Sequence, residues 1–191
     1  MTHEESIEKG LTDKRPYSEI IRKVYLTYPT MALVGQEEKQ FSIFNEISEF
    51  FKIPISSIQI AGSAKTGVSF YKKNKPFTPQ ISDLDVAIID YNLYSYYTEF
   101  VFKSTKAYKV KTGFRIGDYD KYIGYITKGI FRPDLMPSGE KRAEWFNFFG
   151  NLSRKHNDLF GNINAGIYMS QLYFEHKQTS IIRSYIDNKA I

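Results

Sequence analysis

The segment 81–89 has the sequence Ile81-Ser82-Asp83-Leu84-Asp85-Val86-Ala87-Ile88-Ile89. Side chains alternate between the two faces of a β-strand, so the pattern predicts a buried strand in which Asp83 and Asp85 share one face and Leu84 and Val86 the other. Two neighbouring carboxylates repel each other and resist loss of water, so they do not stabilise a sheet by themselves. A hard divalent cation relieves both costs, because Mg²⁺ prefers oxygen ligands and is often held by one or two carboxylates together with substrate phosphates.

A second segment lies upstream and complements the acidic strand. Residues 57–61 (Ser-Ile-Gln-Ile-Ala) alternate as a strand does and lead directly into Gly62-Ser63. The small Gly-Ser step suits the close approach of a phosphate group, because glycine carries no Cβ. Together the two segments predict a site for metal-assisted phosphoryl or nucleotidyl chemistry.

The two segments resemble the signature of the polymerase-β-like nucleotidyltransferase superfamily. That signature is an apolar strand, Gly-Ser, a short helix and then Asp-x-Asp on the next strand. It is matched here by residues 58–67 and 81–89, with Gly67 and Ser82 at two further family positions. The order of predicted helices and strands indicates an α+β domain with a small mixed β-sheet packed by helices on one side, and the resemblance implies that this is the polymerase-β-like nucleotidyltransferase fold.

The resemblance also implies an activity and its ligands. A small stand-alone member of this superfamily moves an NMP from an NTP to an acceptor hydroxyl on a protein, an RNA end or a small molecule. Carried onto this sequence, Asp83 and Asp85 are the catalytic Mg²⁺ (or Mn²⁺) ligands, and Gly62 and Ser63 contact the triphosphate. Lys65 is a candidate for neutralising phosphate charge, with a solvent-exposed lysine as the alternative.

Two departures from the family pattern are visible. The interval between Gly62 and Asp83 is longer than usual, and the excess is assigned to the loop Lys72-Lys73-Asn74-Lys75. This loop is either an insertion at a surface turn or a contact for a nucleic acid backbone.

The second departure concerns the third carboxylate, which the family usually supplies from a later strand. The strand expected over 162–169 offers Asn162 and Asn164 but no acid. Asp118 or Asp120 serves instead if the segment 109–120 is extended. Without a third acid, the site binds nucleotide and metal but reacts slowly or not at all.

Two basic segments complete the candidate residues, namely Arg132-Pro133-Asp134 and Lys141-Arg142. An arginine in a loop beside a phosphate site binds phosphate through two parallel hydrogen bonds. The alternative is that both segments form surface ion pairs.

Composition places the chain among folded proteins without disulfides. Its 191 residues are 42% hydrophobic and 16% aromatic, with no cysteine, three scattered histidines and a formal net charge of +5. We expect a loose polar leader over 1–16 and a single domain over 17–191 that begins with helices, including an amphipathic helix over 37–51. The polar N-terminus and the lack of a long apolar run predict a cytoplasmic protein with no membrane association.

Three functional classes follow from these observations. The first is an Mg²⁺-dependent nucleotidyltransferase, which by size resembles the enzymes of toxin–antitoxin and phage-defence modules. The second is a catalytically degenerate member that binds a nucleotide or serves as a scaffold for a protein partner. The third is a nucleic-acid-binding protein, for which the basic charge and the aromatic residues are the only support.

Overall fold

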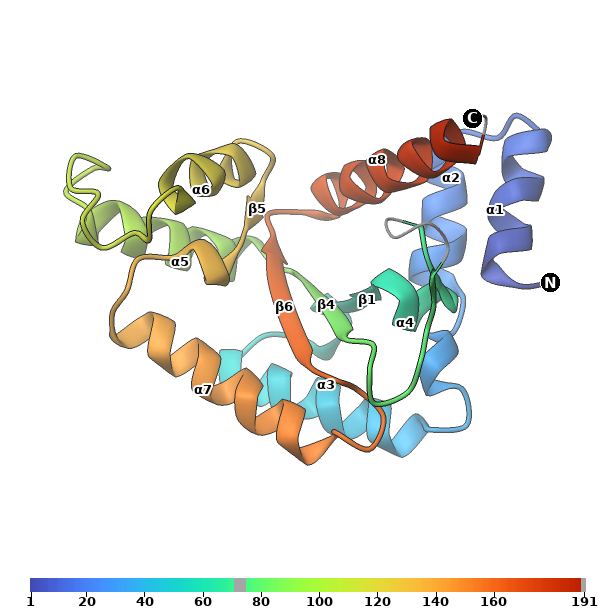
Figure 1. The fold of residues 1–191 in the computed structure, drawn as a ribbon, viewed down its shortest axis with the longest axis horizontal. Helices are drawn as coiled ribbons and strands as arrows, with labels where there is room; N and C mark the ends of the chain where they lie inside the picture. The colour runs from blue at the N-terminus through green and yellow to red at the C-terminus, as the bar shows by residue number, and fades with distance from the viewer. Residues whose placement is uncertain (71–74, 190–191) are drawn as a thin grey trace.

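A four-stranded mixed sheet stands at the centre of the computed structural model, which describes residues 1–70 and 75–189. Its strand order is β1-β4-β6-β5, and helices surround it (Figure 1). The strands span Ile58–Ala61 (β1), Leu84–Ile89 (β4), Ile130–Phe131 (β5) and Ile163–Tyr168 (β6), and a separate short pair joins Val68–Ser69 (β2) to Lys75–Pro76 (β3). The expected α+β class with a small mixed sheet is therefore confirmed.

The register places the ends of the motifs beside each other. Strand β4 runs antiparallel to β1 and parallel to β6, while β5 pairs antiparallel with the far edge of β6. Asp85 is thereby opposite Ala61 on one neighbour and opposite Asn164 on the other. The parallel β4–β6 pair needs a long crossover, which the chain makes through α5 (Tyr91–Ser104), α6 (Asp118–Ile126) and α7 (Glu140–Lys155).

One face of the sheet is fully covered. Leu84, Val86 and Ile88 of β4 point into a core made with α3 (Glu37–Phe51), α5 and α7. Aromatic side chains fill much of this core, and Trp145 contacts both Tyr97 and Phe149. The amphipathic helix predicted over 37–51 is confirmed with those bounds.

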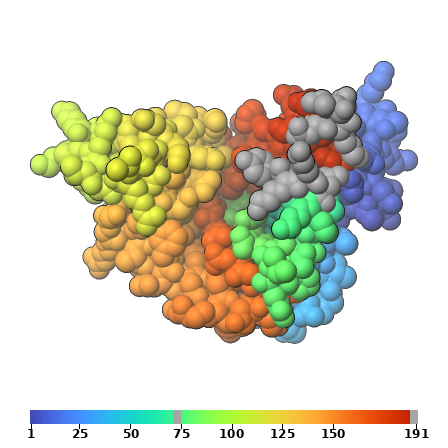
Figure 2. All heavy atoms as spheres, in the orientation of Figure 1, coloured from blue at the N-terminus to red at the C-terminus, as the bar shows by residue number. Residues whose placement is uncertain are grey.

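The opposite face is covered over only half of its length, which corrects the expectation of helices on one side. Ala87 and Tyr168 lie in a second core with α1 (His3–Thr12), α2 (Tyr17–Ile21) and α8 (Gln171–Lys189). Asp85 and Asn164 occupy the same face nearer to the start of β4 and β6, and both are exposed. In Figure 2 the orange-red surface of β6 is visible between α7 and the green segment that leads into β4.

The N-terminal segment is ordered, contrary to the expectation of a loose leader over 1–16. Helix α1 begins with a capping box, in which the Thr2 hydroxyl accepts from the Glu5 N–H and the Glu5 carboxylate accepts from the Thr2 N–H. Ile7 is fully buried against the second core. The polar composition hid this helix because few of its side chains are apolar, and of these Ile7 and Leu11 pack against the second core.

Other boundaries differ locally from the expectations. Helix α2 is followed directly by a π-helical turn, Arg22–Thr27 (η1), and α6 ends at Ile126, shortly before β5. The segment before α6 consists of turns and forms no strand. The short helices are Met31–Leu33 (η2), Ile55–Ser57 (η3), Gly62–Thr66 (α4) and Pro133–Leu135 (η4).

Among the helices of the described ranges, none combines the length and the hydropathy that a membrane span requires.

Candidate functional site

Asp83 and Asp85 lie at the start of β4, where the sheet face is open. Asp85 is the second residue of the strand, and Asp83 directly precedes it. Both are exposed, while Leu84 and Val86 between and after them are buried. The alternation predicted from sequence is confirmed, because the two carboxylates share the solvent-facing side of the sheet.

The loop before Asp83 is fixed by backbone contacts. The Ser82 hydroxyl accepts from the Thr78 N–H at 2.9 Å, and the Ser82 carbonyl accepts from the Gly161 N–H at 3.0 Å. A Cβ on Gly161 would lie 2.7 Å from the Ile81 carbonyl oxygen, so only glycine permits this close approach. Ser82 therefore shapes the entry into β4, and its hydroxyl is engaged within the loop.

Gly62 stands directly beside the acidic strand. A Cβ at this position would lie 2.2 Å from Oδ2 of Asp85, and the φ of Gly62 is +67°, in the left-handed region. Both observations demand glycine here. The Gly-Ser step and the carboxylates, separated in sequence, therefore form one site.

The α4 turn that carries Ser63 is held from within. The Thr66 hydroxyl donates to the Gly62 carbonyl at 3.1 Å or to the Val68 carbonyl at 2.7 Å, which closes the turn. Gly67 ends the helix with a φ of +82°. This arrangement keeps Ser63 at the mouth of the cleft that the carboxylates line.

Lys65 is placed differently from either expectation. Its side chain is buried and its Nζ donates to the Tyr28 carbonyl oxygen at 2.6 Å. Burial lowers the pKa of the Lys65 ammonium to about 8. Lys65 does not line the cleft beside Asp83 and Asp85, so its position gives no support to a contact with phosphate.

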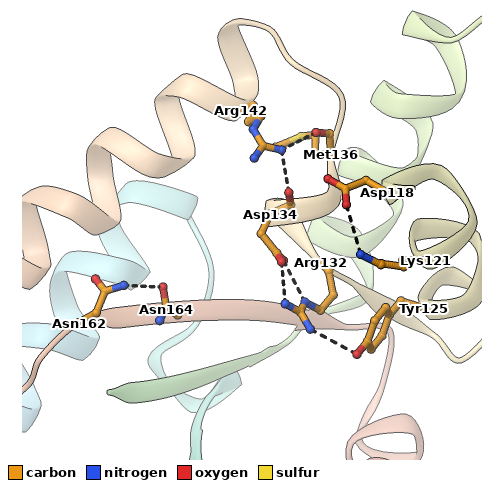
Figure 3. A network of polar contacts seen from close by, with 9 residues as sticks. All are labelled: Asp118, Lys121, Tyr125, Arg132, Asp134, Met136, Arg142, Asn162 and Asn164. Carbon is orange, nitrogen blue, oxygen red and sulfur yellow. Dashed lines mark hydrogen bonds and ion pairs between the residues drawn. The ribbon is translucent and has the colours of Figure 1, made fainter. Parts of the chain in front are cut away.

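Asparagines occupy the place beside the acidic strand. Asn164 pairs in register with Asp85 on the neighbouring parallel strand, as expected for the strand over 162–169. The Asn162 amide donates to Asn164 Oδ1 at 2.9 Å (Figure 3), and the Asn162 Oδ1 accepts from the Ser153 hydroxyl at 2.7 Å. The neighbouring strand thus offers amide oxygens where a third carboxylate was sought.

The other acids considered for the third position lie elsewhere. Asp118 and Asp120 belong to the first turn of α6, and Asp118 forms an ion pair with Lys121 at 3.7 Å. The idea that the segment 109–120 supplies an extended strand is wrong. Within the described residues, no group of three or more His, Cys, Asp or Glu side chains is placed to hold a metal ion.

A cleft of about 780 Å³ opens in front of the two carboxylates. Its walls include Gly62 and Ser63 as well as residues distant in sequence. The basic residues among those that the structure describes there are Lys75, Arg132 and Lys177. This volume falls in the range of about 300–1,000 Å³ that is usual for small-molecule sites.

Arg132 and Asp134 form a fixed ion pair on one wall of the cleft. Nε of Arg132 donates to Oδ1 of Asp134 at 2.9 Å and Nη2 donates to Oδ2 at 2.6 Å (Figure 3). These hydrogen bonds raise the pKa of Arg132. Arg132 also donates to the Tyr125 hydroxyl at 3.3 Å and stacks over its ring. The ion-pair alternative for this segment is therefore confirmed, and the pair lies on the wall of the cleft.

Sequence reasoning missed the contribution of α8. Lys177 and Gln178 of this helix line the cleft, and Gln178 has 1% of its surface exposed. No local motif marks these two residues, since the packing of α8 across the sheet brings them here. Lys75 of β3, the last residue of a loop that the sequence singled out, lines the cleft as well. Of the predicted loop Lys72-Lys73-Asn74-Lys75, the first three residues lie outside the described part of the chain.

The donor set at the open face suits a hard cation. It combines two exposed carboxylates with the amide oxygens of the adjacent strand, and these are the ligands that Mg²⁺ accepts. The charge of Asp85 also acts on Tyr168, which lies further along this face. Burial is the main cause that raises the pKa of the Tyr168 hydroxyl, and the charge of Asp85 is the second. A cation beside Asp85 would relieve this negative field.

Comparison with known proteins finds no family model, no curated protein and no solved structure that matches this chain.

Proposed function

We propose that this protein is an Mg²⁺-dependent nucleotidyltransferase that moves an NMP from an NTP to an acceptor hydroxyl. The observation that carries the proposal is the juxtaposition of Gly62 with Asp85, where a single added methyl group would touch the carboxylate. Two carboxylates, a glycine that permits close approach and a cleft of nucleotide size then occupy one open end of the sheet.

The cation would be held by Asp83 and Asp85, with the Asn164 amide oxygen beside them. When bound, Mg²⁺ supplies stabilisation of the charge that develops on the phosphates during displacement. The role of the carboxylates is to neutralise the cation and fix it at the start of β4. The buried side chains on either side of Asp85 hold that position.

The remaining cleft residues receive the triphosphate. The backbone at Gly62 and the hydroxyl of Ser63 lie at the mouth of the cleft and contact the phosphates. Lys75 and Lys177 supply positive charge, because Arg132 is already neutralised by Asp134. Among the described residues, the cleft thus combines Asp83 and Asp85 with Lys75 and Lys177, beside the paired Arg132 and Asp134.

The reaction is a displacement at the α-phosphorus of the NTP. The acceptor oxygen forms a bond to this phosphorus, the bond to the bridging oxygen breaks, and pyrophosphate leaves with the bonding electrons. The acceptor proton passes to water, since the strand beside Asp85 offers asparagines instead of a third carboxylate. This makes transfer slower than in a site that contains a dedicated base.

Labelled nucleotides test the proposal. The purified protein is incubated with Mg²⁺, each α-³²P-labelled NTP in turn, and cell extract as the source of acceptors. Label is expected on an acceptor from α-labelled but not from γ-labelled NTP. Asp83→Asn and Asp85→Asn should each reduce this transfer by at least about a hundredfold.

A matched variant controls for the loss of charge. Asp120→Asn removes an exposed carboxylate on α6 that does not line the cleft, and it should leave transfer unchanged. Equal transfer by the wild type and Asp85→Asn would show that the label does not come from this site.

The second candidate is a nucleotide-binding module without turnover. The observation that favours it is the pair Asn162 and Asn164 beside the acidic strand, together with the lack of a three-acid cluster in the described residues. It predicts that an NTP with Mg²⁺ raises the melting temperature although no acceptor is labelled. Failure of all four NTPs to raise it contradicts both candidates.

A further inference from the structure

A second hollow adjoins the cleft on the side of α6 and α7. It has a volume of about 710 Å³ and is lined by Arg115, Asp118, Lys121, Tyr125, Arg132, Asp134, Leu135, Arg142 and Phe146. We call it the arginine pocket. Tyr125, Arg132, Asp134 and Phe146 line the cleft as well, so the two spaces share a wall.

The arginine pocket carries more positive than negative charge. Two of its four cations are paired, Arg132 with Asp134 and Lys121 with Asp118 (Figure 3). Arg115 and Arg142 remain, and no ion pair joins either of them to a carboxylate within the described part of the chain. The excess positive charge is therefore located on these two guanidinium groups.

Arg142 is a buried cation with a fixed position. It is only 9% exposed, and its Nη1 donates to the carbonyl oxygens of Asp134 and Met136, both at 2.7 Å. Both bonds use the same nitrogen, Nη1. Within the described residues, Nε and Nη2 of Arg142 donate no hydrogen bond. Its guanidinium also stacks over Phe146, with 5.0 Å between Cζ and the ring centroid.

The two arginines disfavour each other electrostatically. The pKa of Arg142 is lowered by burial first and by the charge of Arg115 second, and the more weakly acting charges of Asp134 and Asp118 do not cancel this lowering. Burying a charge without an ionic partner is costly, and a second like charge adds to the cost. An oxyanion between the guanidinium groups would remove both penalties, because planar N–H donors match a phosphate in geometry as well as charge.

We propose that the arginine pocket binds a phosphate group of the acceptor, with Arg115 and Arg142 as its ligands. The proposal rests on the nucleotidyltransferase function above and specifies its substrate class. An acceptor whose phosphate lies here extends along the shared wall, past Arg132, to the carboxylates in the cleft. The acceptor is therefore a phosphorylated molecule, either a mononucleotide or an RNA end, and an unmodified protein side chain does not satisfy the pocket.

The pocket is tested first by itself, without NTP or Mg²⁺. Inorganic phosphate is titrated into the wild type, Arg115→Gln and the control Lys109→Gln, and binding is followed by calorimetry. Arg115 is exposed, so its replacement should leave the fold intact, and Lys109 is an exposed lysine outside the pocket. We expect Arg115→Gln to weaken phosphate binding about tenfold and Lys109→Gln to leave it unchanged. No phosphate binding, or equal weakening by both variants, overturns the proposal.

The acceptor is tested second, with the cleft intact. Under the transfer assay, AMP and a short oligoribonucleotide are offered as acceptors beside an unphosphorylated protein. Arg115→Gln should raise the KM for the phosphorylated acceptor about tenfold and leave the KM for the NTP unchanged. The better substrate of the two distinguishes a mononucleotide from an RNA end.

Failures of the two proposals can be separated. If phosphate binding depends on Arg115 but no nucleotide is transferred, the acceptor subsite and the nucleotidyltransferase function are both refuted, and the pocket is an anion-binding site only. If the protein transfers nucleotide to an unphosphorylated protein and Arg115→Gln does not affect this transfer, the acceptor assignment is refuted while the nucleotidyltransferase function stands.

Discussion

The substitution Gly62→Ala tests whether the glycine and the acidic strand act as one site. The added Cβ would lie 2.2 Å from Oδ2 and 3.2 Å from Cγ of Asp85. Asp85 is exposed, so its carboxylate can rotate away, but only by leaving the place where it faces the cleft. The expected result is a protein that folds and no longer binds an NTP with Mg²⁺.

The magnitude has two parts. The φ of +67° requires alanine to adopt the left-handed region, which costs about 1–2 kcal/mol. For a domain of this size, such a loss lowers the melting temperature by about 2–8 °C. Loss of the ligand is measured separately, because a ligand at a hundred times its Kd stabilises the folded state by about 2.7 kcal/mol.

Gly67→Ala provides the matched control. Its φ is +82°, so the backbone penalty is similar, but the nearest atom to an added Cβ is Met31 Cγ at 3.9 Å. Both variants should melt at lower temperature than the wild type. Only Gly67→Ala should still be stabilised by NTP and Mg²⁺.

The assay is a thermal melt of wild type and both variants, with and without each NTP in the presence of Mg²⁺. The reasoning is refuted if Gly62→Ala retains the full ligand-induced shift, or if Gly67→Ala loses it as well. The first result would mean that the Asp85 carboxylate is not part of the ligand site. The second would mean that backbone strain at either end of α4 abolishes binding without any contact to Asp85.

Three further perturbations test the core and the site. Below about pH 8 the buried Lys65 ammonium is charged in both the folded and the unfolded chain, so the cost of its burial is fully present. Between about pH 8 and the unfolded pKa of about 10.4, the folded chain releases the Lys65 proton first, and the free energy of unfolding therefore rises. Urea unfolding should therefore show a rise in stability over this range that Lys65→Met removes, and parallel pH profiles would contradict the burial. Ile167→Ala, at a fully buried position of β6, should cost about 2–5 kcal/mol in the same assay and Ile116→Ala, on the surface, less than about 0.5 kcal/mol, so similar losses would contradict the core assignment. Asn164→Asp adds a carboxylate beside Asp85 and should lower the Mg²⁺ concentration at half-maximal thermal stabilisation at least about fivefold, whereas an unchanged midpoint would mean that Asn164 lies outside the cation site.

Local pattern was sufficient for the elements that carry the acids. The alternation around Asp83 and Asp85 predicts the strand and the shared face, because the period of two is a property of extended backbone. The apolar stripe over 37–51 predicts α3 for the same kind of reason. Short or weakly apolar elements such as α1 and β5 were not predicted, because packing against distant residues stabilises them and their own sequence pattern is weak.

The sequence by itself determined that two carboxylates would face one side of a buried strand and that a glycine would precede a tight turn. These are consequences of backbone geometry and the covalent order of neighbours. Only the tertiary structure decided that Gly62 touches Asp85 and that Asn164 stands beside it. It also decided that the open half of the sheet face lies next to Arg132 and Arg142. These contacts join segments far apart in the chain, and they depend on how α7 and α8 pack across the sheet, which no local pattern encodes.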